Sequence, residues 1–153
     1  MAKPIEFFSK NAEFAWLSNF SPHGFTVGGE YWPTVEHFFQ AAKFLGDEAL
    51  EHRNRIRLSG SPKQAKALGQ SRKHKLRPDW EDAKEQVMLV ALRAKFSMPD
   101  LREKLLATGD RPLIEASRFD RYWGAGRDGR GKNRLGVLIM EVRAELHPSN
   151  LKR

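Results

Sequence analysis

Residues 34–44 combine a long apolar surface with a narrow polar strip. The polar side chains Glu36, Gln40 and Lys43 recur at i, i+4 and i+7, and residues with this spacing share one face of an α-helix. Most other positions in the segment are apolar, whereas a helix on a protein surface usually has a wide polar face. The pattern therefore predicts a largely buried helix, with Thr34 as its cap.

The polar strip itself has two interpretations. A carboxyl, an amide and an amine that emerge side by side from an apolar surface are typical of a catalytic pocket. The same strip is also expected at the solvent edge of a buried helix, with Glu36 and Lys43 reaching water along their aliphatic stems. The pattern of this segment leaves both open.

Strand patterns are few. Residues 5–8 are typical of a short strand, and residues 112–116 form another β-prone run between turns. Phe25–Val27 and Glu30–Trp32 flank Gly28 and Gly29, an arrangement that predicts a tight hairpin.

Further helices are predicted where apolar residues recur at helical spacing behind a capping residue. They are a helix capped by Asp47 that ends at Arg57, one from Ser61 and Pro62 to Leu68, the longest from residues 78–80 to Phe96, one from residues 97–99 to Gly109, and a last one capped by Asn133. Helices outnumber strands and no βαβ repeat occurs. We therefore expect a compact, mostly helical α+β fold with a small β-sheet or hairpin layer, in one domain over residues 1–153.

Composition narrows the class of protein. The chain has no cysteine, which excludes disulfides and a thiolate metal site. It has no signal-like segment at its start and no apolar run near the ~20 residues of a membrane span. We expect a cytoplasmic protein that has no membrane partner, and the sequence does not give its oligomeric state.

The net charge of +8 indicates anionic partners. Nine Lys and Arg residues fall between Arg53 and Arg77. A solvated basic face and a site for a phosphate-bearing small ligand both fit this charge. A nucleic-acid groove usually interleaves exposed aromatic residues with its charges, and the only aromatic ring in the stretch is that of His74.

A glycine-rich loop over residues 119–133 is the second candidate for chemistry. Its four glycines allow the backbone to approach a ligand closely. Tyr122 and Trp123 offer flat faces for a heterocycle, and Asp120 is a candidate general base or electrostatic partner. The last helix begins directly after the loop, and its N-terminus is an expected seat for phosphate. The alternative is a flexible surface connection, for which a tryptophan has little use.

Common cofactor and metal motifs do not fit. Residues 124–129 match G-x-G-x-x-G, but the acidic residue expected on a following strand has no place so near the end of the chain. Glu36-His37 lacks a second histidine one turn later, so a zincin site is excluded. No G-x-S-x-G nucleophile motif occurs. We expect neither a metal nor a cofactor.

Several blocks in order along the chain resemble one family. They are residues 17–22 (LSNFSP), 32–44 (WPTVEHFFQAAKF), 61–66 (SPKQAK), 77–80 (RPDW), 120–126 (DRYWGAG) and 131–136 (GKNRLG). Over most of its length the chain resembles the NADAR family of N-glycosidases. The resemblance implies hydrolysis of a ribose C1–N bond in phosphoribosylamino-pyrimidine intermediates of riboflavin biosynthesis, releasing ribose 5-phosphate without a metal. In another branch it implies removal of ADP-ribose from guanine in nucleic acid.

The resemblance and the residue pattern together give the candidate site. Glu36, Lys43 and Asp120 are the expected catalytic residues. In one route a carboxylate, Glu36 or Asp120, stabilises an oxocarbenium-like ribose and activates water. In the other, Lys43 attacks C1 and forms a Schiff base that water hydrolyses. The expected substrate-binding residues are Asn19, Phe20, Gln40, Trp80, Tyr122, Trp123, Gly124 and Asn133, with Trp80 and Trp123 stacking on the base.

The sequence is consistent with three functions. The first is an N-glycosidase for a phosphorylated ribosyl heterocycle. The second is an ADP-ribosyl-guanine hydrolase with nucleic acid as partner, which the basic stretch permits. The third is a non-catalytic module that binds ADP-ribose, and Glu36, Lys43 and Asp120 argue against it because binding alone needs no such trio.

Overall fold

A computed structural model describes residues 2–10 and 13–150 of the chain. Within these ranges it has six α-helices and four short strands. The strands are β1 (Ile5–Phe7), β2 (Phe25–Val27), β3 (Glu30–Trp32) and β4 (Leu113–Glu115). The helices are α1 (Val35–Ala41), α2 (Leu50–Arg57), α3 (Pro62–Gly69), α4 (Trp80–Phe96), α5 (Pro99–Ala107) and α6 (Arg134–Leu146). Single 3-10 turns cover Ala15–Leu17, Asp47–Ala49 and Pro148–Asn150.

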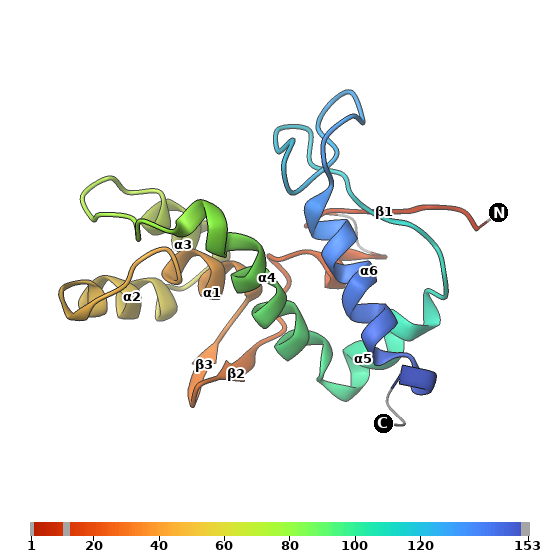
Figure 1. Cartoon of the computed structure of the whole chain (residues 1–153), viewed down its shortest axis with the longest axis horizontal. Helices are drawn as coiled ribbons and strands as arrows, with labels where there is room; N and C mark the ends of the chain where they lie inside the picture. Colours follow the sequence, from red (N-terminus) through yellow and green to blue (C-terminus); the bar gives the residue numbers. More distant parts are fainter. Residues whose placement is uncertain (1, 11–12, 151–153) are drawn as a thin grey trace.

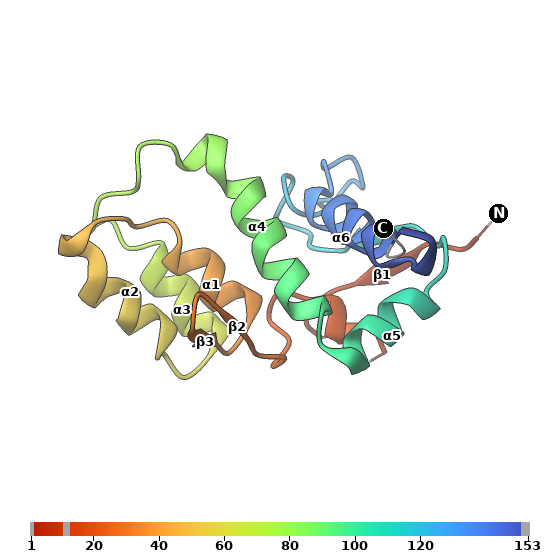
Figure 2. The same ribbon diagram turned by 60° about the horizontal axis from the view of Figure 1, so that its bottom comes forward.

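Helix α4 runs through the middle of the molecule (Figures 1 and 2). Helices α1, α2 and α3 and the hairpin β2–β3 lie on one side of it, and α5, α6 and β1 on the other. Helix α4 packs against α1, α5 and α6, and the buried apolar side chains from both sides form one core. No helix in the described part of the chain is long and apolar enough to cross a membrane.

The strands form two separate two-stranded sheets. The predicted hairpin is confirmed: β2 and β3 are antiparallel, with Phe25 opposite Trp32. Gly28 and Gly29, at φ values of 59° and 82°, make the left-handed turn between them. The strand near the N-terminus pairs in parallel with β4, with Ile5 opposite Leu113. The α+β class is therefore confirmed, with a small β component in two pieces.

Helix α1 begins as predicted and ends early. Thr34 caps it, because its Oγ1 accepts a hydrogen bond of 3.1 Å from the His37 N–H. The predicted end was wrong: the helix stops at Ala41, and Lys43 lies in the turn that follows, where its N–H donates to the carbonyl of Gln40.

Two residues predicted as helix caps, Asp47 and Asn133, do not form a capping hydrogen bond with their side chains. Asp47 opens a 3-10 turn without a side-chain cap, after Gly46 at a φ of 94°. Asn133 does stand at the N-cap position of α6, but its side chain bonds β4 instead. Its Oδ1 accepts from the Glu115 N–H at 2.8 Å, and its Nδ2 donates to the Leu113 carbonyl at 2.9 Å. The amide of Asn133 thus satisfies the free edge of β4, as a neighbouring strand would.

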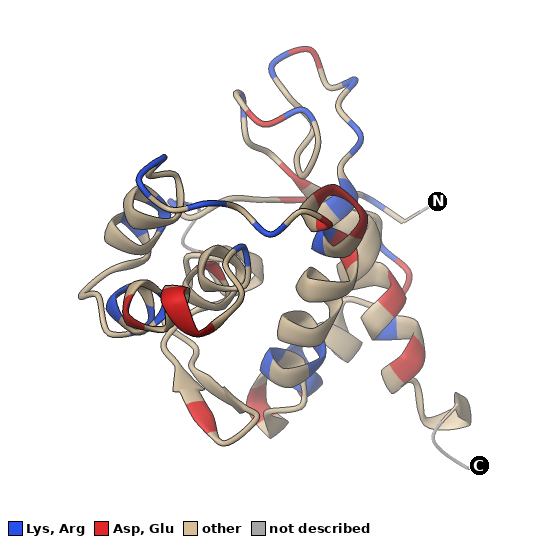
Figure 3. Ribbon diagram, turned by 60° about the vertical axis from the view of Figure 1, so that its left-hand side comes forward, with Lys and Arg blue, Asp and Glu red and all other residues tan. Residues whose placement is uncertain are grey.

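Basic residues recur along the connection between α3 and α4 (Figure 3). This connection runs close to the end of α1, since the Arg77 N–H donates to the Lys43 carbonyl at 2.8 Å. The fold therefore brings the basic segment next to the polar strip of α1.

Candidate active site

A buried carboxyl–amide pair stands on α1. Glu36 is 8% exposed and Gln40 is 3% exposed. The Gln40 Nε2 donates to Glu36 Oε2 at 2.6 Å, and the Glu36 N–H donates to the Asn19 carbonyl at 3.1 Å. Burial raises the pKa of the Glu36 carboxyl, while the hydrogen bond from Gln40 opposes the shift. The first turn of α1 therefore holds a fixed carboxyl group whose proton affinity is increased.

Lys43 lies beside this pair although it is outside the helix. Its side chain is half-buried, and burial lowers the pKa of its amine. The Glu36 carboxylate opposes that shift, and the positive charge of Lys66 on α3 adds to it. The Lys43 Nζ lies 5.8 Å from the ring centroid of Phe39. An amine with a lowered pKa and a carboxyl with a raised one are thus electrostatically coupled.

Asp120 reaches the same group of charges from the glycine-rich loop. Its carboxylate contributes to the raised pKa of Glu36. One of its oxygens, Oδ1, accepts from the N–H groups of Tyr122 at 3.0 Å and Trp123 at 2.8 Å. Asp120 therefore shapes the start of the loop and also brings a negative charge to the site.

Two further charged residues, which no sequence pattern marks as site residues, belong to this cluster. Burial raises the pKa of the Glu115 carboxyl, which is also coupled to Asp120 and Lys66. Gly124 makes room for it, because a Cβ there would overlap the Glu115 carboxylate. Lys66 lies in residues 61–66, one of the blocks that resemble the family, so the resemblance could have identified it. Glu115 follows a short strand and carries no comparable signal.

Aromatic contacts fasten the loop to α1 and α4. The ring centroid of Phe39 on α1 lies 5.0 Å from that of Trp80 and 5.5 Å from that of Trp123, both edge to face. Trp80 is only 7% exposed and Trp123 is partly buried. The structure thus brings together the polar helix and the tryptophan-bearing loop, regions far apart in sequence. Stacking of the two indoles on a base stays a prediction.

The side chain of Tyr122 ties the loop to α4. Its hydroxyl donates to Glu85, and the ammonium of Lys84 lies 3.9 Å from its ring centroid. Glu85 also pairs with Arg134 at 2.7 and 2.9 Å. Tyr122 therefore already has partners on its hydroxyl and on its ring, and its contact with substrate stays a prediction.

The start of α6 does not offer the expected seat for phosphate. The N–H groups of Arg134 and Leu135 donate to the carbonyls of Tyr122 and Trp123 at 2.9 and 3.0 Å. The loop folds back and satisfies these donors with its own backbone, so they are not free for an anion. The Asn133 side chain, predicted to bind substrate, is likewise occupied by β4.

Two buried oxygen atoms lack hydrogen-bond partners among the described residues, one in the loop before the hairpin and one on α1. Asn19 Oδ1 and Gln40 Oε1 are buried and accept no hydrogen bond from the described residues. The Asn19 Nδ2 lies 3.7 Å from the Met88 sulfur. Phe20 is half-buried next to Asn19. Because buried acceptors normally have a donor, Asn19 and Gln40 are candidates to bind a ligand that donates hydrogen bonds.

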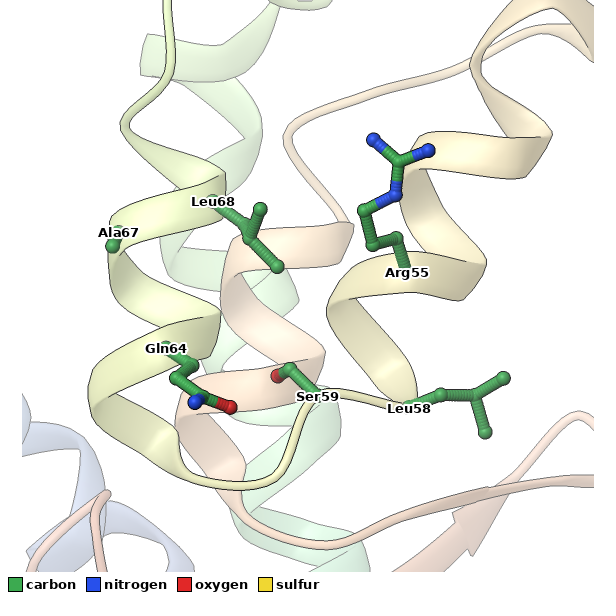
Figure 4. A pocket seen from close by; sticks show the side chains of 6 residues that line it. All are labelled: Arg55, Leu58, Ser59, Gln64, Ala67 and Leu68. Carbon is green, nitrogen blue, oxygen red and sulfur yellow. The ribbon is translucent and has the colours of Figure 1, made fainter.

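A cavity of about 670 Å³ adjoins this cluster. It is lined by Lys43, Gly69 and residues 70–72 and 74–76. Gly69 ends α3 against α1, where a Cβ would overlap the amide of Gln40. A second cavity of about 510 Å³ lies between α2 and α3 (Figure 4) and contains none of the residues described above. Its lining residues are Arg55, Leu58, Ser59, Gln64, Ala67 and Leu68.

The donor set of the site consists of carboxylates, amines and amides. Within residues 2–10 and 13–150, no group of three or more His, Cys, Asp or Glu side chains could hold a metal ion. Carboxyl and amine groups of this kind can transfer protons and stabilise charge, and an amine can attack a carbon atom.

The chain is similar to one protein family and to several known proteins. A family model described as the NADAR domain matches residues 6–147. The N-glycosidase YbiA of Escherichia coli (strain K12) is 47% identical over 143 residues, which cover 93% of this chain and 88% of that protein. The NMR structure of the E. coli protein YbiA has a TM-score of 0.88 at 44% identity, and the match covers 100% of this chain and 90% of that one. The maize riboflavin biosynthesis protein PYRR, chloroplastic, is 41% identical over 93% of this chain, which corresponds to 25% of the maize protein.

Proposed function

The chain belongs to the NADAR family and is an N-glycosidase, and from this premise we propose that it hydrolyses the ribose C1–N bond of phosphoribosylamino-pyrimidine intermediates of riboflavin biosynthesis. The products are ribose 5-phosphate and the free aminopyrimidine. The observation that carries the proposal is the coupling of the buried Glu36 carboxyl to the Lys43 amine beside a cavity. The name of the maize relative supports the choice of substrate class.

In the first route, Glu36 acts as a carboxylate. It stabilises the positive charge that develops on C1 as the bond to nitrogen breaks, and it accepts a proton from the attacking water. The electron pair of the broken bond goes to the nitrogen, which takes a proton from the Lys43 ammonium, and Glu36 then passes the proton of the water back to Lys43. The hydrogen bond from Gln40 holds one carboxylate oxygen, so the other oxygen is left for the water.

In the second route, Lys43 acts as a nucleophile. The ribosylamine ring opens, the Lys43 nitrogen adds to C1, and the aminopyrimidine leaves with the former bond pair and a proton. Water then hydrolyses the lysine Schiff base and regenerates the amine. Burial supports this route because it lowers the pKa of Lys43, whereas the neighbouring Glu36 favours the ammonium form.

The remaining site residues have proposed binding roles. Asn19 and Gln40 offer buried acceptors to hydroxyl or amino groups of the ligand. Trp80 and Trp123 both contact the ring of Phe39, and we assign them to the base. Asp120 supports the positive charge at C1 from the side of the loop.

One assay tests this function. The purified protein is incubated with the phosphoribosylamino-pyrimidine, and released ribose 5-phosphate is measured. Borohydride is added during turnover, and the protein is analysed by mass spectrometry. A reduced adduct on Lys43, absent from Lys43→Ala, supports the second route. Turnover without an adduct supports the first route, and no product release contradicts the function.

A second candidate substrate is ADP-ribosylated guanine in nucleic acid. The observation that favours it is the basic segment along the connection between α3 and α4 (Figure 3). The same assay includes an oligonucleotide that carries ADP-ribose on guanine. Release of ADP-ribose, without release of ribose 5-phosphate from the pyrimidine, would establish this substrate in place of the first. Binding of either substrate without release would favour a non-catalytic module.

A further inference from the structure

A strongly basic interval of the chain lies next to the proposed reaction centre. Between Glu51 and Asp79 the chain has no acidic residue, and nine Lys and Arg residues fall in this interval. Part of the interval, the connection between α3 and α4, lines the 670 Å³ cavity. Arg72 and Lys75 are the strongly basic side chains of this lining besides Lys43. A cavity shared by the candidate nucleophile and two other cations is suited to an anionic group of the substrate.

The backbone of this connection is fixed to the end of α1. The Arg77 N–H donates to the Lys43 carbonyl at 2.8 Å, and its guanidinium donates to the Ala42 carbonyl at 3.3 Å. The Arg77 charge is itself paired with Asp79 through contacts of 2.6 and 2.9 Å. Arg77 therefore positions the connection relative to Lys43, and its charge is already compensated.

The middle of the connection is held by stacked rings. His74 stacks on His52 of α2, with centroids 3.8 Å apart and planes 12° apart, and its edge faces Phe44. The flanking residues Arg72 and Lys75 are exposed. Neither forms an ion pair with an acidic residue in the described part of the chain, so their charges are available to a ligand.

Two arginines near the glycine-rich loop have their charges paired with carboxylates. Around the glycine-rich loop, Arg121 pairs with Asp128 at 2.6 Å and Arg134 pairs with Glu85 at 2.7 Å. The first N–H groups of α6 are bonded to the loop. The cavity lined by Arg72 and Lys75 thus brings two cations that are unpaired within the described residues and Lys43 together in one lining, whereas Lys66 lies outside this lining and acts on the carboxyl groups of the cluster.

We propose that Arg72 and Lys75 form the phosphate subsite of this active site and bind the 5′-phosphate of the ribosyl substrate. The proposal rests on the function proposed above. Guanidinium and ammonium groups make strong, charge-assisted hydrogen bonds to phosphate oxygens, and the Ser71 hydroxyl in the same lining can add a neutral donor. The 5′-phosphate and C1 of one ribose are only a few bonds apart. A phosphate held here therefore presents C1 to Lys43 and Glu36.

Kinetics with paired substrates test the subsite. The double variant Arg72→Gln/Lys75→Gln is compared with the wild type on the phosphorylated substrate and on its dephosphorylated riboside. We expect kcat/KM for the phosphorylated substrate to fall about 100-fold or more, mainly through KM, because two charge-assisted contacts are lost. The kcat/KM for the riboside should stay unchanged.

A matched control removes two charges from the same basic interval. Lys63→Gln/Lys73→Gln changes exposed residues that do not line the cavity, so it should keep wild-type kcat/KM on both substrates. If it loses as much activity as the first double variant, general attraction by net charge explains the effect and the subsite is refuted. Both variants alter exposed side chains, and matching thermal melts verify that they fold.

Binding of ribose 5-phosphate separates failure of the subsite from failure of the function. Calorimetry should detect binding by the wild type and its loss in the Arg72→Gln/Lys75→Gln variant. If the wild type hydrolyses neither substrate but this binding pattern holds, the proposed function fails and the subsite stands. If the wild type hydrolyses the substrate and the variant retains its kcat/KM, the subsite fails and the function stands. Loss confined to an ADP-ribosylated oligonucleotide would assign the two cations to a phosphodiester and overturn the proposal.

Discussion

The buried Lys95 leads to a quantitative prediction about how the stability of the protein depends on pH. It lies on α4 and is 1% exposed. Its Nζ donates to the Ser18 carbonyl at 2.9 Å, and no salt bridge forms to it within the described residues. Ser18 precedes Asn19, whose carbonyl accepts the Glu36 N–H. The buried amine therefore anchors the segment whose backbone accepts the N–H of Glu36, the proposed catalytic residue.

Burial lowers the pKa of Lys95 from 10.5 to about 7. Between these two values the unfolded chain keeps a proton that the folded protein has lost. The unfolded state then binds more protons, so the free energy of unfolding rises with pH across this window. The slope approaches about 1.4 kcal/mol per pH unit, which gives a gain of about 2–3 kcal/mol between pH 7.5 and 9.5.

Lys95→Met removes the titrating group and keeps an unbranched side chain. The free energy of unfolding of each protein is measured by urea denaturation at several values from pH 7.5 to 9.5. The difference between wild type and variant should change by about 2–3 kcal/mol in favour of the wild type as pH rises. Other titrating groups are common to both proteins and cancel. Lys63→Met, on the exposed face of α3, should run parallel to the wild type. A parallel curve for Lys95→Met would refute the reasoning.

Three other predictions concern the site directly. Burial raises the pKa of Glu36, so kcat/KM should decline on the acidic side at a pH above the ordinary glutamate range, as protonation removes the carboxylate. That acidic limb should vanish from the residual activity of Glu36→Gln, and an unchanged limb would assign it to another group. Gly69→Ala should push the Gln40 amide away from Glu36 and lower kcat about tenfold at a stability cost of about 1–3 kcal/mol, whereas Gly60→Ala, in the turn before α3, should leave kcat unchanged. Trp123→Ala should raise KM severalfold in steady-state assays, and unchanged kinetics would count against stacking on the base.

The sequence predicts most of the local structure because its signals are local. Thr34 and Ser61 cap helices where their side chains can reach an N–H three residues later. The paired glycines at residues 28–29 make the hairpin turn where the left-handed conformation is needed. Helix α1 ends earlier than its apolar pattern predicts, because the chain turns after Ala41 to place Phe44 in the core.

The features that the sequence does not predict depend on contacts between segments that are separate in sequence. The parallel pairing of β1 with β4 joins residues more than a hundred positions apart, and no short motif encodes it. The Asn133 side chain bonds β4, which lies 18 to 20 positions earlier in the chain, and a capping motif does not predict this. Glu115 joins the charge cluster only because β4 and the glycine-rich loop pack together, with Gly124 against its carboxylate. Polar residues on one helix are thus predictable, whereas their partners on other elements require the fold.

Release of ribose 5-phosphate by three proteins tests the central claim most directly: the wild type, Glu36→Gln and Lys43→Ala. All three are assayed on the phosphoribosylamino-pyrimidine at the same enzyme concentration, with thermal melts to verify folding. The wild type should release the sugar phosphate. Loss of the group that carries the chemistry, Glu36 in the first route or Lys43 in the second, should lower kcat/KM about a hundredfold or more, the size of effect expected for general acid–base and nucleophilic groups. Wild-type rates in both variants would contradict the account.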